Sequence, residues 1–244
     1  MREATIGGMA DGASAALHSH GLPRVCDIIG DYERFVEEVD SELRARGLDA
    51  LARGFEMDHL CYRCATVAEY LDVIDALVPA LGIAQVEGMI GGRPIATIRL
   101  HMPLEHRGFV IRCIEVPCPK PGSPYTVGLE HAELVVGQPS DGCVSSARLL
   151  AFIDECSTCT NLTLETSALH KECNAEVSHA FTLSDGRPAC IKFHNRPLYE
   201  VVDWEKKQGT VVPVPEGYFA EAMRTRKVAD AHDVSSLSSR AVTV

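Results

Sequence analysis

The sequence predicts an α+β fold in which a βαβββ module occurs twice, and the two modules share one mixed sheet behind an extra N-terminal helix. The main observation is the order of predicted elements, which runs βαβββ over about residues 56–118 and again over about 127–196. A second observation is that strands of both modules place ionisable side chains on one face. The chain has 244 residues, 46% of them hydrophobic, which is ordinary for a globular protein with a core.

The N-terminal helix is predicted over residues 31–46. Asp31 is a suitable N-cap, and Gly47 is a suitable stop. Between them, apolar side chains recur at helical spacing. These side chains are Phe35, Val36, Val39 and Leu43.

The first module begins with an alternating strand over residues 58–64. Thr66 and Glu69 then form a capping box that opens a helix. Gly91 and Gly92 predict a tight hairpin turn. Three strands are expected around this turn, over residues 83–89, 94–101 and 108–116.

The second module repeats this order. A strand over residues 129–136 precedes a predicted helix over 143–157. Asp185-Gly186 is a typical hairpin turn. Three further strands are expected, over residues 162–166, 177–183 and 188–194.

These elements predict a single domain over residues 25–205. Residues 1–24 are rich in Gly, Ala and Ser and predict a disordered tail. Residues 206–244 contain two prolines followed by a polar tract, and they predict a loose C-terminal tail.

Composition excludes several classes of function. The formal net charge is −11, and no basic stripe offers a nucleic-acid surface. No apolar run reaches the roughly 18 residues of a membrane span. The N-terminus lacks the pattern of a secretory signal, so a cytoplasmic protein is expected. The expected partner is a small molecule.

The ten cysteines do not form a recognisable motif. Cys61/Cys64 and Cys156/Cys159 have C-x-x-C spacing, but most of the chain separates the two pairs, unlike the knuckles of a zinc ribbon. We interpret them as reduced, mostly buried thiols. A redox sensor remains a third, weaker hypothesis for the whole chain.

Four strands each carry ionisable groups on one face. His59 shares its face with Arg63, and His131 shares its face with Glu133. The last strands of the modules add Glu115, and then Lys192 with His194. Burial of such groups without partners would cost several kcal/mol each, roughly. A shared metal ion or a bound anion would satisfy them, and two imidazoles with a carboxylate suit Zn, Fe(II), Ni or Mn.

Several segments together resemble the YecM-like family of the vicinal oxygen chelate superfamily. The resemblance covers about residues 25–205. It implies paired βαβββ modules that form a cupped sheet around one divalent metal ion. The segments that carry it are Asp58-His59-Leu-Cys-Tyr-Arg63, Gly92-Arg93-Pro94-Ile, Ile114-Glu115-Val-Pro117-x-Pro119, Glu130-His131-x-Glu133 and Ile191-Lys192-Phe193-His194.

The resemblance also implies a ligand set. The first and last strands of the modules supply ligands in this superfamily, which gives His59, Glu115 and His131. Lys192 stands where glyoxalase-like enzymes carry a carboxylate, so His194 is the reserve fourth ligand, with Glu133 or water as alternatives. Glu133 is also the candidate catalytic base.

Two functions follow as hypotheses. The first is a metal-dependent isomerase, lyase or dioxygenase-like enzyme, in which Arg63 and Lys192 bind a small oxygenated anionic substrate. The second is a metal-independent binding or sequestering protein of the bleomycin resistance type. For Arg63, the alternative role is a structural ion pair with Glu133 across the sheet.

Overall fold

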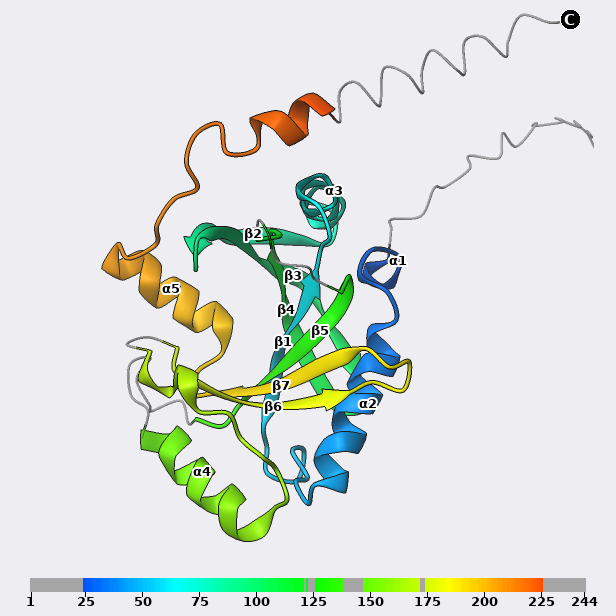
Figure 1. Ribbon diagram of the computed structural model, residues 1–244, viewed down its shortest axis with the longest axis vertical. Coiled ribbons are helices and arrows are strands. Elements are labelled where there is room, and N and C mark those ends of the chain that lie inside the picture. The colour runs from blue at the N-terminus through cyan, green and yellow to red at the C-terminus, as the bar shows by residue number, and fades with distance from the viewer. Residues whose placement is uncertain (1–23, 121, 123–125, 138–146, 172–173, 226–244) are drawn as a thin grey trace, which may run out of the picture.

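A computed structural model describes residues 24–225 except 121, 123–125, 138–146 and 172–173. The described residues form an α+β fold around one open, mixed sheet of seven strands (Figure 1). No helix in this part of the chain combines the length and apolar character needed to cross a membrane.

The two modules form the two halves of this sheet, with strand order β2-β3-β4-β1-β5-β7-β6. In each half the first strand runs parallel to the last, as β1 does to β4 and β5 to β7. The antiparallel pair β1–β5 joins the halves. The first module comprises β1 (Glu56–Arg63), α3 (Val67–Leu77), β2 (Gly82–Ile90), β3 (Arg93–His106) and β4 (Phe109–Pro117). The second comprises β5 (Gly128–Val135), α4 (Ala147–Cys159), β6 (Glu176–Thr182) and β7 (Pro188–His194).

The predicted strand over residues 162–166 is not formed. This segment makes only an isolated antiparallel bridge between Glu165 and Ser178 of β6. The Glu165 carboxylate then accepts a hydrogen bond from the Ser167 backbone N–H at 2.8 Å, and the chain turns into a short 3-10 helix, η1 (Ser167–His170). Local side-chain bonding to the backbone thus competes with strand pairing. The second module has a reduced outer edge.

The helix predicted over 31–46 is confirmed as α2 (Tyr32–Ala45), and Asp31 accepts a capping hydrogen bond from the Arg34 backbone N–H. A short helix, α1 (Val25–Ile29), precedes it. The expected helix over 143–157 is present from Ala147 as α4, and its first residues lie outside the described part of the chain. The hairpin at Gly91-Gly92 is confirmed, and both glycines have positive φ angles, which Gly tolerates without strain.

Besides the short α1, the helix after the last strand was not predicted. Helix α5 (Leu198–Gln208) follows β7, and Gly209 ends it in the left-handed conformation. Apolar Leu198, Val201 and Val202 form its buried stripe at i, i+3 and i+4 spacing. The helix lies on the opposite side of the sheet from α2 (Figure 1). The apolar stripe of α5 can be read from the sequence, so the periodic signal for this helix was present.

Residues beyond 205 make definite contacts as far as the structure describes them. The Met89 backbone N–H of β2 donates to the Val212 carbonyl at 2.8 Å, and Gly88 bridges to Pro213. Further along, the Phe219 ring stacks on Tyr70 of α3 with centroids 5.7 Å apart. The start of the predicted loose tail thus lies against the first module. The limits of the domain at residues 25 and 205 stay a prediction.

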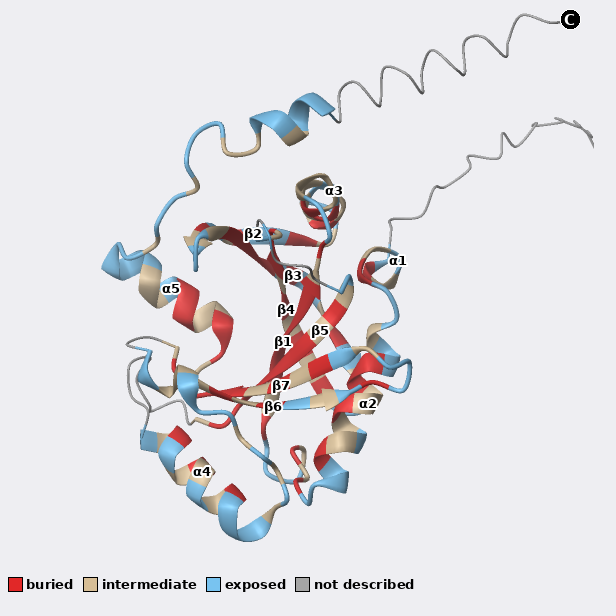
Figure 2. Ribbon diagram, in the orientation of Figure 1, coloured by how far each residue is buried: buried red, intermediate tan, exposed pale blue. Residues whose placement is uncertain are grey.

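The main core lies between the sheet and the helices α1 to α4, where the strands are buried along their central part (Figure 2). Phe193 of β7 is fully buried and packs against Phe152 of α4 with ring centroids 4.7 Å apart. Because β7 alternates, Phe193 faces the helices while its neighbours Lys192 and His194 face the other side of the sheet. Core packing therefore fixes which side chains reach the site.

We expect Phe193→Ala to lower the free energy of unfolding by about 3–5 kcal/mol, because it removes a buried ring and leaves a cavity. Urea denaturation measures the effect. Met102→Ala is the control, since Met102 is 80% exposed, and it should change stability by less than about 0.5 kcal/mol. Equal effects of the two substitutions would contradict the placement of this core.

Candidate functional site

Two neighbouring rows of paired residues cross the middle of the sheet and carry most of the predicted site residues. In one row, Cys61 of β1 lies opposite Glu115 of β4 and opposite His131 of β5. In the next row, Glu133 of β5 lies between His59 of β1 and Lys192 of β7. Both rows face the side of α5, so the structure brings together groups that are far apart in the sequence.

A β-bulge lies beside each of the two histidines. Between β1 and β5, Met57 pairs with Leu134 and His59 with Glu133, so Asp58 is an extra residue in β1. In the same ladder Cys61 pairs with His131 and Tyr62 with Leu129, so Glu130 is an extra residue in β5. A bulge re-aims the side chain of its extra residue. Each module therefore presents an acidic residue beside the histidine that follows it.

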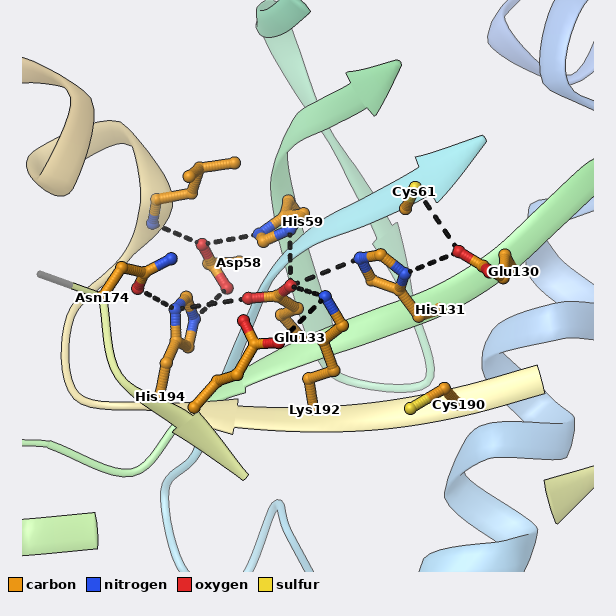
Figure 3. A network of polar contacts seen from close by, with 12 residues as sticks. Asp58, His59, Cys61, Glu130, His131, Glu133, Asn174, Cys190, Lys192 and His194 are labelled. Carbon is orange, nitrogen blue, oxygen red and sulfur yellow. Dashed lines mark hydrogen bonds and ion pairs between the residues drawn. The ribbon is translucent and has the colours of Figure 1, made fainter. Parts of the chain in front are cut away.

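The predicted ligand atoms of His59, Glu115 and His131 all lie within 4.8 Å of one another. Glu133 lies in the centre of the site (Figure 3). Its Oε1 is 3.4 Å from His59 Nε2 and 3.3 Å from His131 Nε2. The two imidazole nitrogens thus converge on one point from the two modules.

Three polar atoms at this point are buried and have no hydrogen-bond partner among the described residues. They are His59 Nε2, His131 Nε2 and Glu133 Oε2. The contacts of the two imidazoles with Glu133 are within ion-pair range but lack hydrogen-bond geometry. An unsatisfied buried polar group costs about 1–3 kcal/mol, so three at one place call for a further group between them.

Asp58 is a site residue that the sequence reasoning did not assign. Its carboxylate is fully buried and bonds to His59 Nδ1 at 3.1 Å and His194 Nε2 at 2.9 Å. It also accepts the Leu198 backbone N–H at 2.6 Å, which ties the start of α5 to the site. Burial alone would raise the pKa of Asp58, but the charges of His194 and His59 outweigh burial and hold the pKa well below its usual value. Asp58 is therefore a fixed negative charge.

Glu130 holds the corresponding position in the second module, and the sequence reasoning did not assign it to the site either. Its Oε2 lies 3.0 Å from His131 Nδ1 and 2.5 Å from Arg63 Nε. Burial raises the pKa of Glu130, but His131 and Arg63 together lower it to about 2. Each histidine thus directs one ring nitrogen to an acidic neighbour and the other into the site, an arrangement that orients metal-binding histidines. The signal in the sequence was the acid-His dipeptide at the start of each module.

The two predicted substrate-binding cations have partners. Arg63 forms its ion pair with Glu130. The alternative role of Arg63, a structural ion pair, named Glu133 as the partner, and that partner was wrong. Lys192 Nζ lies 3.0 Å from Glu133 Oε1 and 3.5 Å from Glu176 Oε1. Burial lowers the pKa of Lys192, but Glu133 and Glu176 outweigh it and raise the pKa well above its usual value. Lys192 therefore stays charged beside the central carboxylate.

His194 does not join the group formed by His59, Glu115 and His131. Its Nε2 bonds to Asp58, and its Nδ1 lies 3.1 Å from the Asn174 side-chain oxygen. Its Nδ1 is also 3.4 Å from Glu133 Oε2. His194 lies behind the central carboxylate and links it to Asp58.

A cavity of about 480 Å³ opens over this face of the sheet, and residues from all seven strands line it. Its floor includes Glu115, His131, Glu133 and Lys192. The sheet therefore wraps around one site, which agrees with the predicted cupped form. The size is typical of small-molecule pockets.

The eight described cysteines are free, and most are buried. Burial raises the pKa of Cys64 and of Cys113 to about 12. The thiolate is the reactive form of cysteine, so these thiols are chemically quiet at neutral pH. The buried thiols therefore give no support to a redox sensor.

Comparison with known proteins places the chain near one family. The family model described as YecM protein matches residues 24–205. The protein YecM of Escherichia coli (strain K12) is 29% identical over 184 residues, which cover 74% of this chain and 93% of that protein. A solved structure described as protein EC4020 matches with a TM-score of 0.54 and 29% identity, over 73% of this chain and 91% of that chain.

A more remote likeness is to a methylmalonyl-CoA epimerase of Streptomyces coelicolor. The identity is 9% and the TM-score 0.35, over 57% of this chain and 96% of that chain. A likeness at this distance does not bear on the ligand of this chain.

We expect Asp58→Ala to lower the free energy of unfolding by about 3–5 kcal/mol, because it leaves two buried imidazoles and the Leu198 N–H without their acceptor. Urea denaturation at neutral pH measures the loss. Asp154→Ala, at an exposed position of α4, is the control and should stay within about 0.5 kcal/mol of the parent. A stable, fully cooperative Asp58→Ala protein would show that the buried network is not needed for folding.

Proposed function

The chain belongs to the YecM protein family, and we propose that it is a divalent-metal-binding protein that acts on a small oxygenated anionic ligand. In this proposal His59, His131 and Glu115 hold the metal ion, and Glu133 is the fourth candidate ligand. The observation that carries the proposal is that the buried His59 Nε2 and His131 Nε2 approach the same Glu133 oxygen from the two modules and have no hydrogen-bond partner among the described residues.

A metal ion fits the donor set. The atoms within 4.8 Å of one another are two imidazole nitrogens and a carboxylate oxygen. This mixture suits Zn, Fe, Ni or Mn and leaves coordination positions for a ligand. Burial lowers the pKa of His59, but Glu133 and Asp58 outweigh it and raise the pKa well above its usual value. The same negative surroundings that favour a proton on His59 would favour a cation between the histidines.

Glu133 fits the role of ligand better than that of catalytic base. Burial alone would raise its pKa, but the charges of Lys192 and His59 lower it well below the usual value. A carboxylate that holds its proton so weakly is a poor base at neutral pH. Its position between both imidazoles instead makes it a suitable partner for a cation.

The rest of the cavity suits an anion with oxygen donors. When bound, the metal ion would supply Lewis-acid stabilisation of negative charge on the ligand oxygens. Lys192 would place a second positive charge beside them. Arg63 would support this arrangement through Glu130, with which it is paired. The reaction class stays a proposal among isomerase, lyase and dioxygenase-like chemistry.

The alternative is a protein that binds its ligand without a metal. One observation favours it, because Lys192 lies 3.0 Å from Glu133 and already neutralises part of the central charge. The two functions differ in a direct measurement of metal affinity.

We expect the purified protein to bind Zn²⁺ or Mn²⁺ at one site, as measured by isothermal titration calorimetry after dialysis against chelator. His59→Ala and His131→Ala should each weaken binding by at least about 100-fold, because each removes a ligand where loss of a supporting group already costs 10–100-fold. His170→Ala is the control, since His170 is exposed. Undiminished metal affinity in both variants would place the site elsewhere. Absence of metal binding by the parent would support the metal-independent function.

The acidic neighbour of His131 gives a separate test. We expect Glu130→Gln to weaken metal binding by about 10–100-fold, because the amide no longer holds His131 with a charged acceptor. Glu105→Gln, at an exposed position of β3, should bind the metal as the parent does. The same titration measures both, and equal affinities would remove Glu130 from the site.

A further inference from the structure

The cavity has a second, apolar part that the proposed metal site does not use. On the side of the first module it is lined by Met89 and Ile90 at the β2–β3 hairpin, with the charged Arg93 beside them. Helix α5 adds Leu198, Val201 and Val202, all buried. These side chains line the same cavity as the polar floor, so a molecule bound by its oxygens at the floor would have apolar side chains within the same cavity.

The remaining apolar wall is formed by the start of the segment 210–219, which we call the strap. Val211 and Val212 of the strap line the cavity. Backbone pairing holds the strap on β2, through the Met89 N–H to the Val212 carbonyl and the bridge from Gly88 to Pro213. A Cβ atom at Gly88 would come within 3.2 Å of Val211 Cγ1 and of the Val212 carbonyl oxygen, so the absence of a side chain there permits the close approach.

The strap is anchored at both ends. Before it, α5 is tied to β2 by Gln85 Nε2, which donates to the Tyr199 carbonyl at 2.8 Å and to Asp203 at 2.9 Å. At its end, Phe219 stacks on Tyr70. The strap also lies beyond residue 205, where the match to the family model ends. The strap is therefore held in place by contacts within this chain. It lies outside the region that the family model matches.

Two apolar side chains at the cavity are left uncovered. Ile90 is 54% exposed and Val212 is 57% exposed, and both line the cavity. Exposed apolar side chains that line the same pocket mark a binding surface more often than isolated ones do. A ligand with an aliphatic tail would cover both of them.

We propose that the strap completes an apolar subsite, and that the ligand is a carboxylic acid with an aliphatic tail of several carbons. The position of the head group rests on the proposed function. The tail lies between α5, the β2–β3 hairpin and the strap. Each methylene that enters this subsite should strengthen binding by about four-fold.

The test uses 2-hydroxybutanoate, 2-hydroxyhexanoate and 2-hydroxyoctanoate, titrated by calorimetry into the full chain loaded with Mn²⁺. We expect affinity to rise by about four-fold per methylene. The double variant Val211→Ser/Val212→Ser should bind 2-hydroxybutanoate as the parent does but lose most of the gain with tail length. Met102→Ser is the matched control, because Met102 is exposed on β3 and does not line the cavity.

A second variant displaces the strap without changing its sequence. Gly88→Val should push the strap away from β2 and flatten the dependence on tail length, while Mn²⁺ affinity and the melting temperature report that the site and the fold persist. The proposal would be overturned if the affinity of the parent did not change with tail length. It would also be overturned if affinity rose with tail length as steeply in Val211→Ser/Val212→Ser and in Gly88→Val as in the parent.

The failure of the proposed function has a different signature. If the parent binds no divalent metal, the proposed function is lost, and butanoate, hexanoate and octanoate then test the subsite through the melting temperature of the metal-free protein. A rise with tail length that the strap variants abolish would uphold the subsite. No rise for any of the three acids would overturn it.

Discussion

The antiparallel pairing of β1 with β5 is the constraint on which the rest of the structure depends. It joins the two modules, and its register places His59 opposite Glu133 and Cys61 opposite His131. Because side chains alternate along a strand, a shift of one residue would turn the histidines toward the helices. The two bulges at Asp58 and Glu130 are part of this register, and they give each histidine its acidic neighbour. Pairing of the modules and formation of the site are therefore one event.

Burial of this many charges is costly unless each has a partner. Asp58 and Glu133 are at most 2% exposed, and they remain ionised because His59, His194 and Lys192 surround them. Replacement of such a network by apolar side chains often stabilises a protein, so fold stability alone does not explain it. Two of the residues with unsatisfied atoms, His131 and Glu133, line the cavity. A role in binding accounts for both features.

The sequence predicted what depends on local periodicity. The period-two pattern placed His59, Glu115, His131 and Lys192 on one face. The structure brings Glu115, His131 and Lys192 to one cavity, with His59 close to Glu115 and His131. The bulges were beyond prediction from alternation, because an extra residue in one strand is defined only by its partner strand. For this reason Asp58 and Glu130 were missed or misread. The strand over 162–166 failed for a related reason, since an edge segment has a partner on one side only and Glu165 bonds to its own turn instead. Helix α5 was missed despite a readable apolar stripe.

The two halves of the fold agree at the floor of the site and differ at its walls. Acid-His pairs from β1 and β5 approach the centre in the same way, as expected for paired modules. Above the floor, the second module contributes only the polar side chains Lys171, Asn174 and Glu176 among the described residues, whereas the first contributes the apolar Val86, Met89, Ile90 and Ile95 beside the polar Arg93 and Thr97. The reduced edge of the second module and the strap on the edge of the first reinforce this difference. If the proposed function holds, a symmetric floor would let both modules hold one ion, and asymmetric walls would give a bound molecule one orientation, with its charged end toward β6 and β7 and its apolar end toward β2. Differences among relatives in what they bind should therefore lie in the walls, and the strap is the part of the wall outside the region that the family model matches.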